Sequence, residues 1–300
     1  MPTSSDSSSR NDVKSALRWA IPRLAQITDA PRLEAELLLS HHLRTNRAHL
    51  LAHPEIPLSP AQRAAYERDV RERATGTPLP YITGEREFFG LTFAVTSDVL
   101  IPRPETETLV EIALAWLVRH PAPEAIRAVD VGTGSGCIAV ALAAHRPTLH
   151  ICAVDLSRAA LCVARANAER HHVAARVSFV QSDLLSAVAG PLDLIVSNPP
   201  YVAAEAWADL PISVQREPRR ALLSGAEGLD AIRRLLDQAA RRLAPGGLLL
   251  IEIGERQANA AQTYAQAAFP DASIRIVPDL AGKDRVLEVQ VISPKRCTPA

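Results

Sequence analysis

The segment LDLIVSNPPYV, at 192–202, holds the side chains with the clearest chemical potential in the chain. Its apolar opening predicts a buried strand that ends at Asn198, because the prolines that follow cannot donate to a sheet. Asn198 offers a neutral amide oxygen, and the carbonyl of Pro199 offers a second acceptor held by the rigid backbone of Pro199 and Pro200. Tyr201 adds a flat ring. Two fixed acceptors can take both N–H hydrogens of a planar nitrogen, which orients it for attack on an electrophile.

Three glycines in AVDVGTGSGCIAV, namely Gly132, Gly134 and Gly136, lie between a predicted strand and a helix. Glycine there allows a tight turn and a close approach to a ligand. The G-x-G-x-G spacing differs from the dinucleotide pattern, and the absence of a lysine disfavours a phosphate loop. Asp155 and Asp183 end the next two strands, where a carboxylate can bind ribose hydroxyls or lie near a base. Taken singly, these residues also fit a structural turn and solvated caps, so their order is the more specific signal.

Strand and helix patterns alternate from residue 127 onward, which predicts a doubly wound, mostly parallel α/β sheet. The last two strands are close together in sequence, which allows one of them to run antiparallel. The strands are expected at 128–131, 151–154, 177–180, 192–197, 248–253, 274–277 and 286–292.

The N-terminal part has a helical pattern from 13 to about 73 and is expected to form a small bundle. Ser59 and Pro60 predict the start of one helix, and Gly76 predicts its end. An earlier helix is expected to bury a broad face that holds Leu33, Leu37, Leu38 and Leu43.

Domain boundaries follow from these changes of pattern. Short apolar runs on either side of Gly90 predict a β-hairpin between the helical part and the sheet. The expected order is a disordered tail at 1–12, a helical domain at 13–78, a linking hairpin at 79–100, an α/β domain at 101–293 and a tail at 294–300.

Composition narrows the classes of partner. The chain has 33 basic and 33 acidic residues and 4% aromatics, which does not indicate a general nucleic-acid binder, a membrane-surface binder or a base-stacking platform. The cysteines lack metal-binding spacing, and Cys137, Cys152 and Cys162 are expected in the core, so no metal is expected. The sequence has no apolar run of 18 residues and no signal-peptide pattern, so the cytoplasm is the expected location.

The order of a glycine turn, two strand-ending acids and NPPY resembles the class I S-adenosylmethionine-dependent methyltransferases, over about residues 127–292. That family has a seven-stranded, Rossmann-like sheet whose last strand is antiparallel. The resemblance implies S-adenosyl-L-methionine as the cofactor, with the glycine turn at its methionine part, Asp155 at its ribose, and Asp183 with Leu184 around its adenine. The cofactor-binding residues implied in this way are Gly132, Thr133, Gly134, Ser135, Gly136, Asp155, Asp183, Leu184 and Asn198.

Further motifs, IPRPETE, EPRRALLSGAEGLD, LAPGGLLLIEIGERQ and DLAGKDRVLEV, together with NPPYV resemble the protein-glutamine N5-methyltransferases that act on peptide chain release factors. The resemblance is nearly full length and includes the helical domain and the hairpin. It implies methyl transfer to the amide N5 of the glutamine in the Gly-Gly-Gln motif of class 1 release factors, with the helical domain recognising this partner. A monomer is expected, although the sequence does not determine the oligomeric state. Asn198, Pro199 and Tyr201 would be catalytic, and Pro200 would help them to bind the substrate.

Three other functions compete with this interpretation. An adenine-N6 methyltransferase acting on DNA or RNA also carries NPPY, but it would need a basic recognition surface that the balanced charge does not indicate. Glutamine methyltransferases that act on a ribosomal protein are close relatives that also carry NPPY, although IPRPETE is more similar to the release-factor branch. A non-catalytic binding module would not need to keep Asp155 and Asn198. The roles of Arg103, Glu105, Glu217 and Glu252 stay open.

Replacement of Asn198 by alanine shows whether this residue mainly orients the target or mainly helps to bind the cofactor. If the amide acts mainly in the transition state, Asn198→Ala lowers turnover by about 10²-fold or more, because one fixed acceptor is lost. Steady-state kinetics together with calorimetric titration of the cofactor measures both effects. Equal losses in turnover and in cofactor affinity would instead assign Asn198 to the architecture of the pocket.

Overall fold

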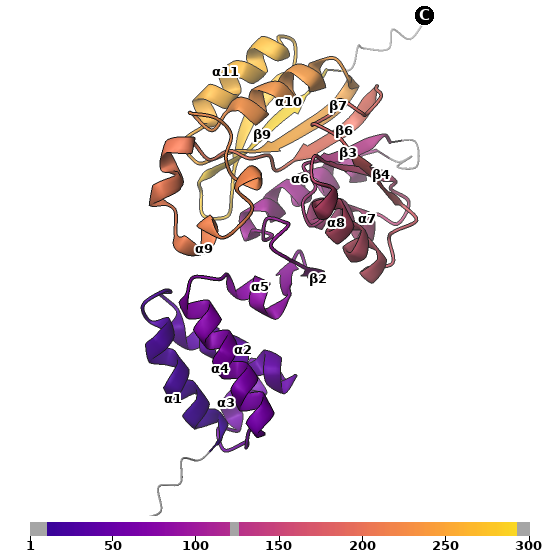
Figure 1. Cartoon of the computed structure of the whole chain (residues 1–300). Helices are drawn as coiled ribbons and strands as arrows, with labels where there is room; N and C mark the ends of the chain where they lie inside the picture. The colour runs from indigo at the N-terminus through magenta and orange to yellow at the C-terminus, as the bar shows by residue number, and fades with distance from the viewer. Residues whose placement is uncertain (1–10, 121–125, 293–300) are drawn as a thin grey trace, which may run out of the picture. The chain divides into compact units, whose positions relative to one another are not determined.

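The computed structural model describes residues 11–120 and 126–292 of the chain (Figure 1). The predicted tail residues 1–10 and 294–300 lie outside these ranges. Asp12, at the end of the predicted N-terminal tail, caps the first helix. In the described ranges, no helix is long and apolar enough to cross a membrane.

The chain divides into two compact units: Met1–Gly84 with Pro211–Arg216, and Glu85–Leu210 with Glu217–Ala300. The first unit is helical. Its helices are α1 (Val13–Leu24), α2 (Pro31–Leu43), α3 (Arg47–Ala52), α4 (Pro60–Ala74), α5 (Leu79–Thr83) and α9 (Ile212–Gln215).

Side-chain caps set the starts of α1 and α4. Asp12 and Ser15 form a capping box at the start of α1, and Ser59 and Gln62 form another at the start of α4. Helix α4 ends two residues before Gly76, whose φ of +101° is outside the helical region. The predicted start and stop of α4 are therefore confirmed by the backbone.

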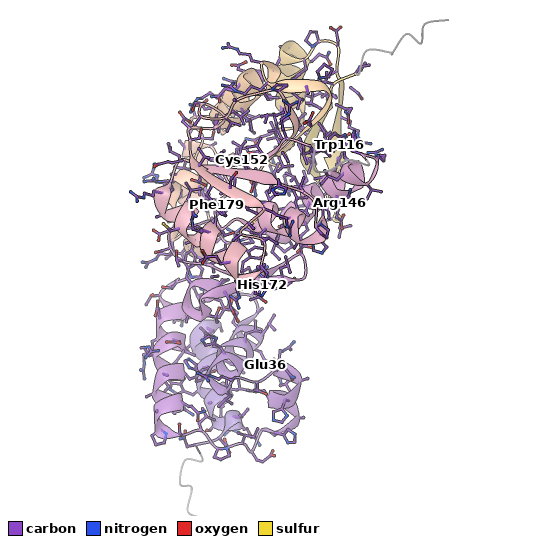
Figure 2. All side chains as sticks on the ribbon, turned by 90° about the vertical axis from the view of Figure 1, so that its right-hand side faces the viewer. Glu36, Trp116, Arg146, Cys152, His172 and Phe179 are labelled. Carbon is purple, nitrogen blue, oxygen red and sulfur yellow. The ribbon has the colours of Figure 1, made fainter. Side chains whose placement is uncertain are left out.

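The predicted buried face of α2 is partly wrong. Leu33 and Leu37 are exposed, whereas Leu38 is buried in the core of the unit. The leucine pattern was ambiguous because α2 has apolar residues around most of its circumference. The buried side of α2 also includes a carboxylate: Glu36 lies inside the unit (Figure 2), paired with two arginines that reach in from α2 and α3.

The second unit begins with the predicted hairpin, formed by β1 (Glu85–Phe88) and β2 (Leu91–Ala94) in antiparallel pairing. Phe88 and Phe93 from the two strands are buried in the core of this unit. A short 3₁₀ turn, η1 (Pro104–Thr106), leads into α6 (Glu107–Val118). The motif IPRPETE therefore occupies the loop and turn just before α6.

Seven strands form one sheet within the described residues, in the order β5-β4-β3-β6-β7-β9-β8. Neighbours from β5 to β7 pair in parallel, whereas β9 is antiparallel to β7 and β8. This topology confirms the predicted seven-stranded α/β fold with an antiparallel last strand. The strands are β3 (Ala128–Val131), β4 (Ile151–Asp155), β5 (Val177–Gln181), β6 (Leu192–Ser197), β7 (Leu243–Glu252), β8 (Ser273–Pro278) and β9 (Asp284–Gln290).

Helices cover both faces of the sheet, and two separate apolar clusters fill the space beneath them (Figure 1). Alternate residues of each strand enter opposite clusters: Leu194 and Val196 of β6 face one cluster, and Ile195 faces the other. One cluster lies under α6 and α7 (Cys137–His145) and the other under α10 (Asp230–Ala240) and α11 (Ala258–Ala268).

The expectation for the cysteines is confirmed for one residue only. Cys137 is buried, whereas Cys152 is half-buried. Cys152 lies on β4, and the neighbouring strand β5 carries Phe179 (Figure 2). Cys162 is exposed, because α8 (Arg158–Arg170) turns Leu161, Ala164 and Ala168 toward the protein instead.

Gly136 is a position where the backbone and the packing both require glycine. Its φ is +82°, and a Cβ would lie 3.0 Å from the Cβ of Ala164. Gly136→Ala should lower the free energy of unfolding, measured in urea, by about 1–3 kcal/mol. Gly282→Ala is the matched control, because its φ is +76° but a Cβ meets nothing within 4 Å. A larger loss at Gly282 than at Gly136 would contradict this account.

Candidate active site

Strand register brings three predicted segments to one level at the edge of the sheet. Val131, the last residue of β3, pairs with Val154 of β4 on one side and with Ser197 of β6 on the other. Because parallel strands end at the same edge, the next residue of each strand lies at the ligand-binding edge of the sheet. These three residues are Gly132, Asp155 and Asn198.

A cavity of about 370 Å³ opens at this edge, between the glycine turn, the strand ends and the loop 98–103. Its size lies within the range of about 300–1,000 Å³ that is usual for small-molecule sites. Among the predicted residues, Gly136, Pro199 and Tyr201 do not line it. The predicted residues that line it are Gly132, Thr133, Gly134, Ser135, Asp155, Asp183, Leu184, Asn198 and Pro200.

Asp155 is fixed by the backbone around it. One carboxylate oxygen accepts from the N–H of Gly134 at 2.9 Å, and the other accepts from the N–H of Ser157 at 2.8 Å. Burial raises the pKa of Asp155, and these two hydrogen bonds oppose the shift. Each oxygen keeps a further lone pair, so the carboxylate can still accept two hydroxyl hydrogens.

Asp183 and Leu184 lie on the wall of the cavity beyond Asp155. The Asp183 side chain is exposed and forms an ion pair with Arg234 of α10 at 2.5 Å. Leu184 has a φ of +51°, which is uncommon for a leucine. This backbone turn places an apolar side chain beside the exposed carboxylate, which suits a flat group with a polar edge.

Asn198 is held by a residue that the sequence interpretation missed. Its side-chain nitrogen donates to the hydroxyl of Thr106 at 3.0 Å, and that hydroxyl donates to Glu252 Oε2 at 2.6 Å. The hydroxyl of Tyr201 donates to the other oxygen of Glu252 at 3.2 Å. Two side chains of NPPY therefore converge on one carboxylate at the end of β7.

The Glu252 carboxylate lies deep in the protein, with only 1% of the residue exposed. Burial raises the pKa of Glu252 to about 6, while hydrogen bonds from Thr106 and Tyr201 and the charge of Arg285 act in the opposite direction. Burial also raises the pKa of Tyr201, and the Glu252 charge adds to that effect. Tyr201 is thus a neutral donor at ordinary pH.

The loop 98–103 is attached to the segment after NPPY by a second buried carboxylate. Glu217 accepts from the backbone N–H of Ile101 at 3.0 Å and pairs with the Arg103 guanidinium at 2.5 Å. Glu105 is exposed. The motifs IPRPETE and EPRRAL therefore meet through Arg103 and Glu217, which gives both residues a structural contact beside the cavity.

Asp130 is a further polar residue at the glycine turn that the sequence interpretation did not assign. It is fully buried in β3 and accepts from the Thr133 hydroxyl at 2.6 Å and from the Ala139 N–H at 3.2 Å. Burial raises its pKa to about 7. A charged residue inside the apolar strand AVDV was the signal that could have drawn attention to it.

The backbone that leaves NPPY is also fixed. The side-chain amide of Gln257 donates to the carbonyl of Tyr201 at 2.9 Å, and a Cβ on Gly228 would lie only 2.2 Å from the same carbonyl.

In the described ranges, no group of three or more His, Cys, Asp or Glu side chains is placed to hold a metal ion. The site thus consists of fixed hydrogen-bonding groups around a largely apolar cavity.

Comparison with known proteins identifies the family. Residues 15–84 match the PrmC N-terminal domain, and residues 108–216 match the methyltransferase small domain. A release factor glutamine methyltransferase from Moorella thermoacetica is 45% identical over 275 residues, which is 91% of this chain and 96% of that protein. The chain belongs to the release factor glutamine methyltransferases. A second member, from Cereibacter sphaeroides, is 45% identical over 279 residues, covering 92% of this chain and 97% of that protein.

Solved structures agree on the fold of this family member. The hMettl16 catalytic domain, in complex with MAT2A 3'UTR hairpin 6, aligns with a TM-score of 0.56 and 18% identity. The alignment covers 77% of this chain and 84% of that one. The relatives thus confirm the predicted family, and the solved structure confirms the predicted fold.

The contacts of Glu217 with Ile101 and Arg103 can be tested through the stability of the protein. Glu217→Gln removes the charge that pairs with Arg103 and leaves an amide that can accept from only one of its two present donors. The free energy of unfolding of the sheet-containing unit should fall by about 1–3 kcal/mol in urea titrations. The exposed pair of Glu227 with Arg233 supplies the control, because Glu227→Gln should change stability by less than about 0.5 kcal/mol. A loss of unfolding free energy in Glu217→Gln that is no larger than the loss in Glu227→Gln would contradict this expectation.

Proposed function

We propose that this family member transfers a methyl group from S-adenosyl-L-methionine to the side-chain amide N5 of the glutamine in the Gly-Gly-Gln motif of class 1 peptide chain release factors. The observation that carries the proposal is the position of Asn198, on the wall of a cavity beside the glycine turn, with its NH₂ group bonded to Thr106. This arrangement leaves the amide oxygen as an acceptor for the target. The family and its named relatives support the choice of substrate.

The residues around the cavity fit the proposed cofactor. Asp155 keeps two lone pairs that would accept the ribose hydroxyls, Asp183 and Leu184 on the cavity wall would contact the adenine, and the glycine turn would contact the methionine part. When bound, the cofactor supplies a sulfonium methyl group that is open to in-line attack. We assign Gly132, Thr133, Gly134, Ser135 and Asn198 to the remaining cofactor contacts. Gly136 completes the same turn, but it does not line the cavity.

The protein acts on the target amide through orientation. An amide nitrogen is a poor nucleophile because its lone pair is conjugated with the carbonyl. In the proposal, the Asn198 oxygen and the Pro199 carbonyl accept the two N–H hydrogens, which turns the lone pair toward the methyl group. Pro200 and the ring of Tyr201, which does not line the cofactor cavity, contact the glutamine side chain. A carboxylate at position 198 could also accept, but it would bring a charge that must lose its water.

The wider predictions belong to the same proposal. A protein substrate fits a chain with equal numbers of basic and acidic residues better than a nucleic acid does. Action without metal or nucleic acid, as a monomer in the cytoplasm and with the helical unit recognising the release factor, stays a prediction.

Mass spectrometry of a release factor incubated with the protein and S-adenosyl-L-methionine tests the proposal. The peptide that contains Gly-Gly-Gln should gain one methyl group on the glutamine, and the gain should disappear when that glutamine is replaced by alanine. A ribosomal protein and a DNA duplex containing adenine serve as parallel substrates. Methyl transfer to either of these but not to the release factor, or none at all with the cofactor shown to bind, would overturn the proposal.

A further inference from the structure

We propose that Glu252 is a positioning residue for methyl transfer: through Thr106, its carboxylate sets which end of the Asn198 amide faces the target. The inference rests on the proposed function and adds a residue that touches neither cofactor nor target. Glu252 is the last residue of β7, Thr106 precedes α6, and Asn198 follows β6. Three separate elements of the same unit therefore meet at this chain of hydrogen bonds.

The direction of the chain follows from the chemistry of its members. An ionised carboxylate can only accept, so the Thr106 proton points to Glu252 Oε2, at 2.6 Å. The Thr106 oxygen then has only lone pairs to offer, and the group of Asn198 that lies 3.0 Å away must be its NH₂. The amide oxygen of Asn198 is consequently left for the target.

The opposite arrangement has the wrong polarity for the reaction. A flipped Asn198 amide would place its oxygen against the Thr106 oxygen, so that two acceptors would face each other. It would also present an NH₂ group to the NH₂ of the target glutamine, where two donors cannot bond. The energetic difference between the two orientations comes from the carboxylate, because Thr106 alone could donate or accept.

Protonation of Glu252 would remove this preference. A neutral carboxyl can donate to Thr106, which frees the Thr106 proton for the oxygen of a flipped Asn198. The groups that face Glu252 are the hydroxyls of Thr106 and Tyr201, the guanidinium of Arg285 from β9, the carboxylate of Glu105 and the thiol of Cys137 from α7. With burial raising the pKa of Glu252 to about 6, its ionised fraction falls as the pH drops through 6, and turnover should fall with it.

Paired variants separate positioning from packing. Thr106→Val keeps the shape but removes the hydroxyl, whereas Thr106→Ser keeps the hydroxyl. Glu252→Gln keeps the size of the side chain but offers both a donor and an acceptor to Thr106, so it no longer fixes the orientation of the Asn198 amide. Glu288→Gln is the matched control, because Glu288 is a buried glutamate of β9 that pairs with Arg275 on the same sheet. The probes are turnover and KM for the release factor from pH 5 to 9, calorimetric cofactor affinity and thermal unfolding.

The expected result is a fall in turnover of about tenfold or more for Thr106→Val and Glu252→Gln at pH 8, the size usual for residues that orient a functional group. Thr106→Ser and Glu288→Gln should stay within about threefold of the unmodified protein, and cofactor affinity should change little in all four. The decline in turnover near pH 6 should be present in the unmodified protein and absent in Glu252→Gln.

Two outcomes overturn the inference while the proposed function stands. In both, the unmodified protein methylates the release factor. In one, Thr106→Val matches Thr106→Ser; in the other, the decline near pH 6 persists in Glu252→Gln and belongs to another group, such as Asp130. The pH profile of the unmodified protein tests the inference even if a variant does not fold. A turnover that stays constant from pH 5 to 8 would refute it. Absence of methylation by the unmodified protein would overturn the proposed function itself.

Discussion

The parallel pairing of β3 with β4 on one side and β6 on the other is the constraint on which the site depends. In-register pairing at Val131 aligns the ends of three strands, so residues far apart in sequence become neighbours. The direct bonds then refine this placement: the Gly134 N–H to Asp155 ties the turn after β3 to the end of β4. The sheet supplies coarse alignment, and buried polar contacts supply the final orientation.

Two buried glutamates, Glu252 and Glu217, supply this final orientation. Glu252 accepts from Tyr201 and, through Thr106, fixes Asn198, and Glu217 holds the loop 98–103 that forms part of the cavity wall. Both are costly to bury, so each is surrounded by donors: hydroxyls for Glu252, and a backbone N–H with a guanidinium for Glu217. Rigidity at the site is therefore obtained from polar groups, whereas the two apolar clusters stabilise the sheet that carries it.

Much of the fold was predictable because apolar runs and the motifs at their ends mark the parallel strands. Strand β6 was expected with its observed bounds, since NPPY gives an unambiguous end. Strand β7 begins at Leu243, five residues earlier than expected, because its first residues pair with β6 across an irregularity near Leu192. The leucines of α2 and the exposure of Cys162 were misjudged, since alanine-rich or apolar helices give a weak signal of which side is buried.

The residues of the site were predictable only where a motif marks them. Glycines, strand-ending acids and NPPY can be found in the sequence, and most of them line the cavity. Thr106 could not be found in this way, because its partners Asn198 and Glu252 lie 92 and 146 residues away and a threonine before a helix is usually read as a cap. Asp130 did carry a signal, as a charged residue inside an apolar strand, but its hydrogen bonds to Thr133 and Ala139 depend on a burial that one sequence does not report.

The division of the chain has a consequence for how such proteins can change during evolution. The helical unit is made of two pieces of sequence, and its smaller piece, Pro211–Arg216, lies between NPPY and EPRRAL. Within that unit, Ile212 lies so close to Gly76 that a Cβ on the glycine would be 3.0 Å from it. A single genetic crossover near residue 84 would thus join a new helical segment to an old Ile212. Exchange of the helical unit between relatives requires matched changes at two sites in the gene, which couples the history of the helical bundle to that of the motifs around the active site.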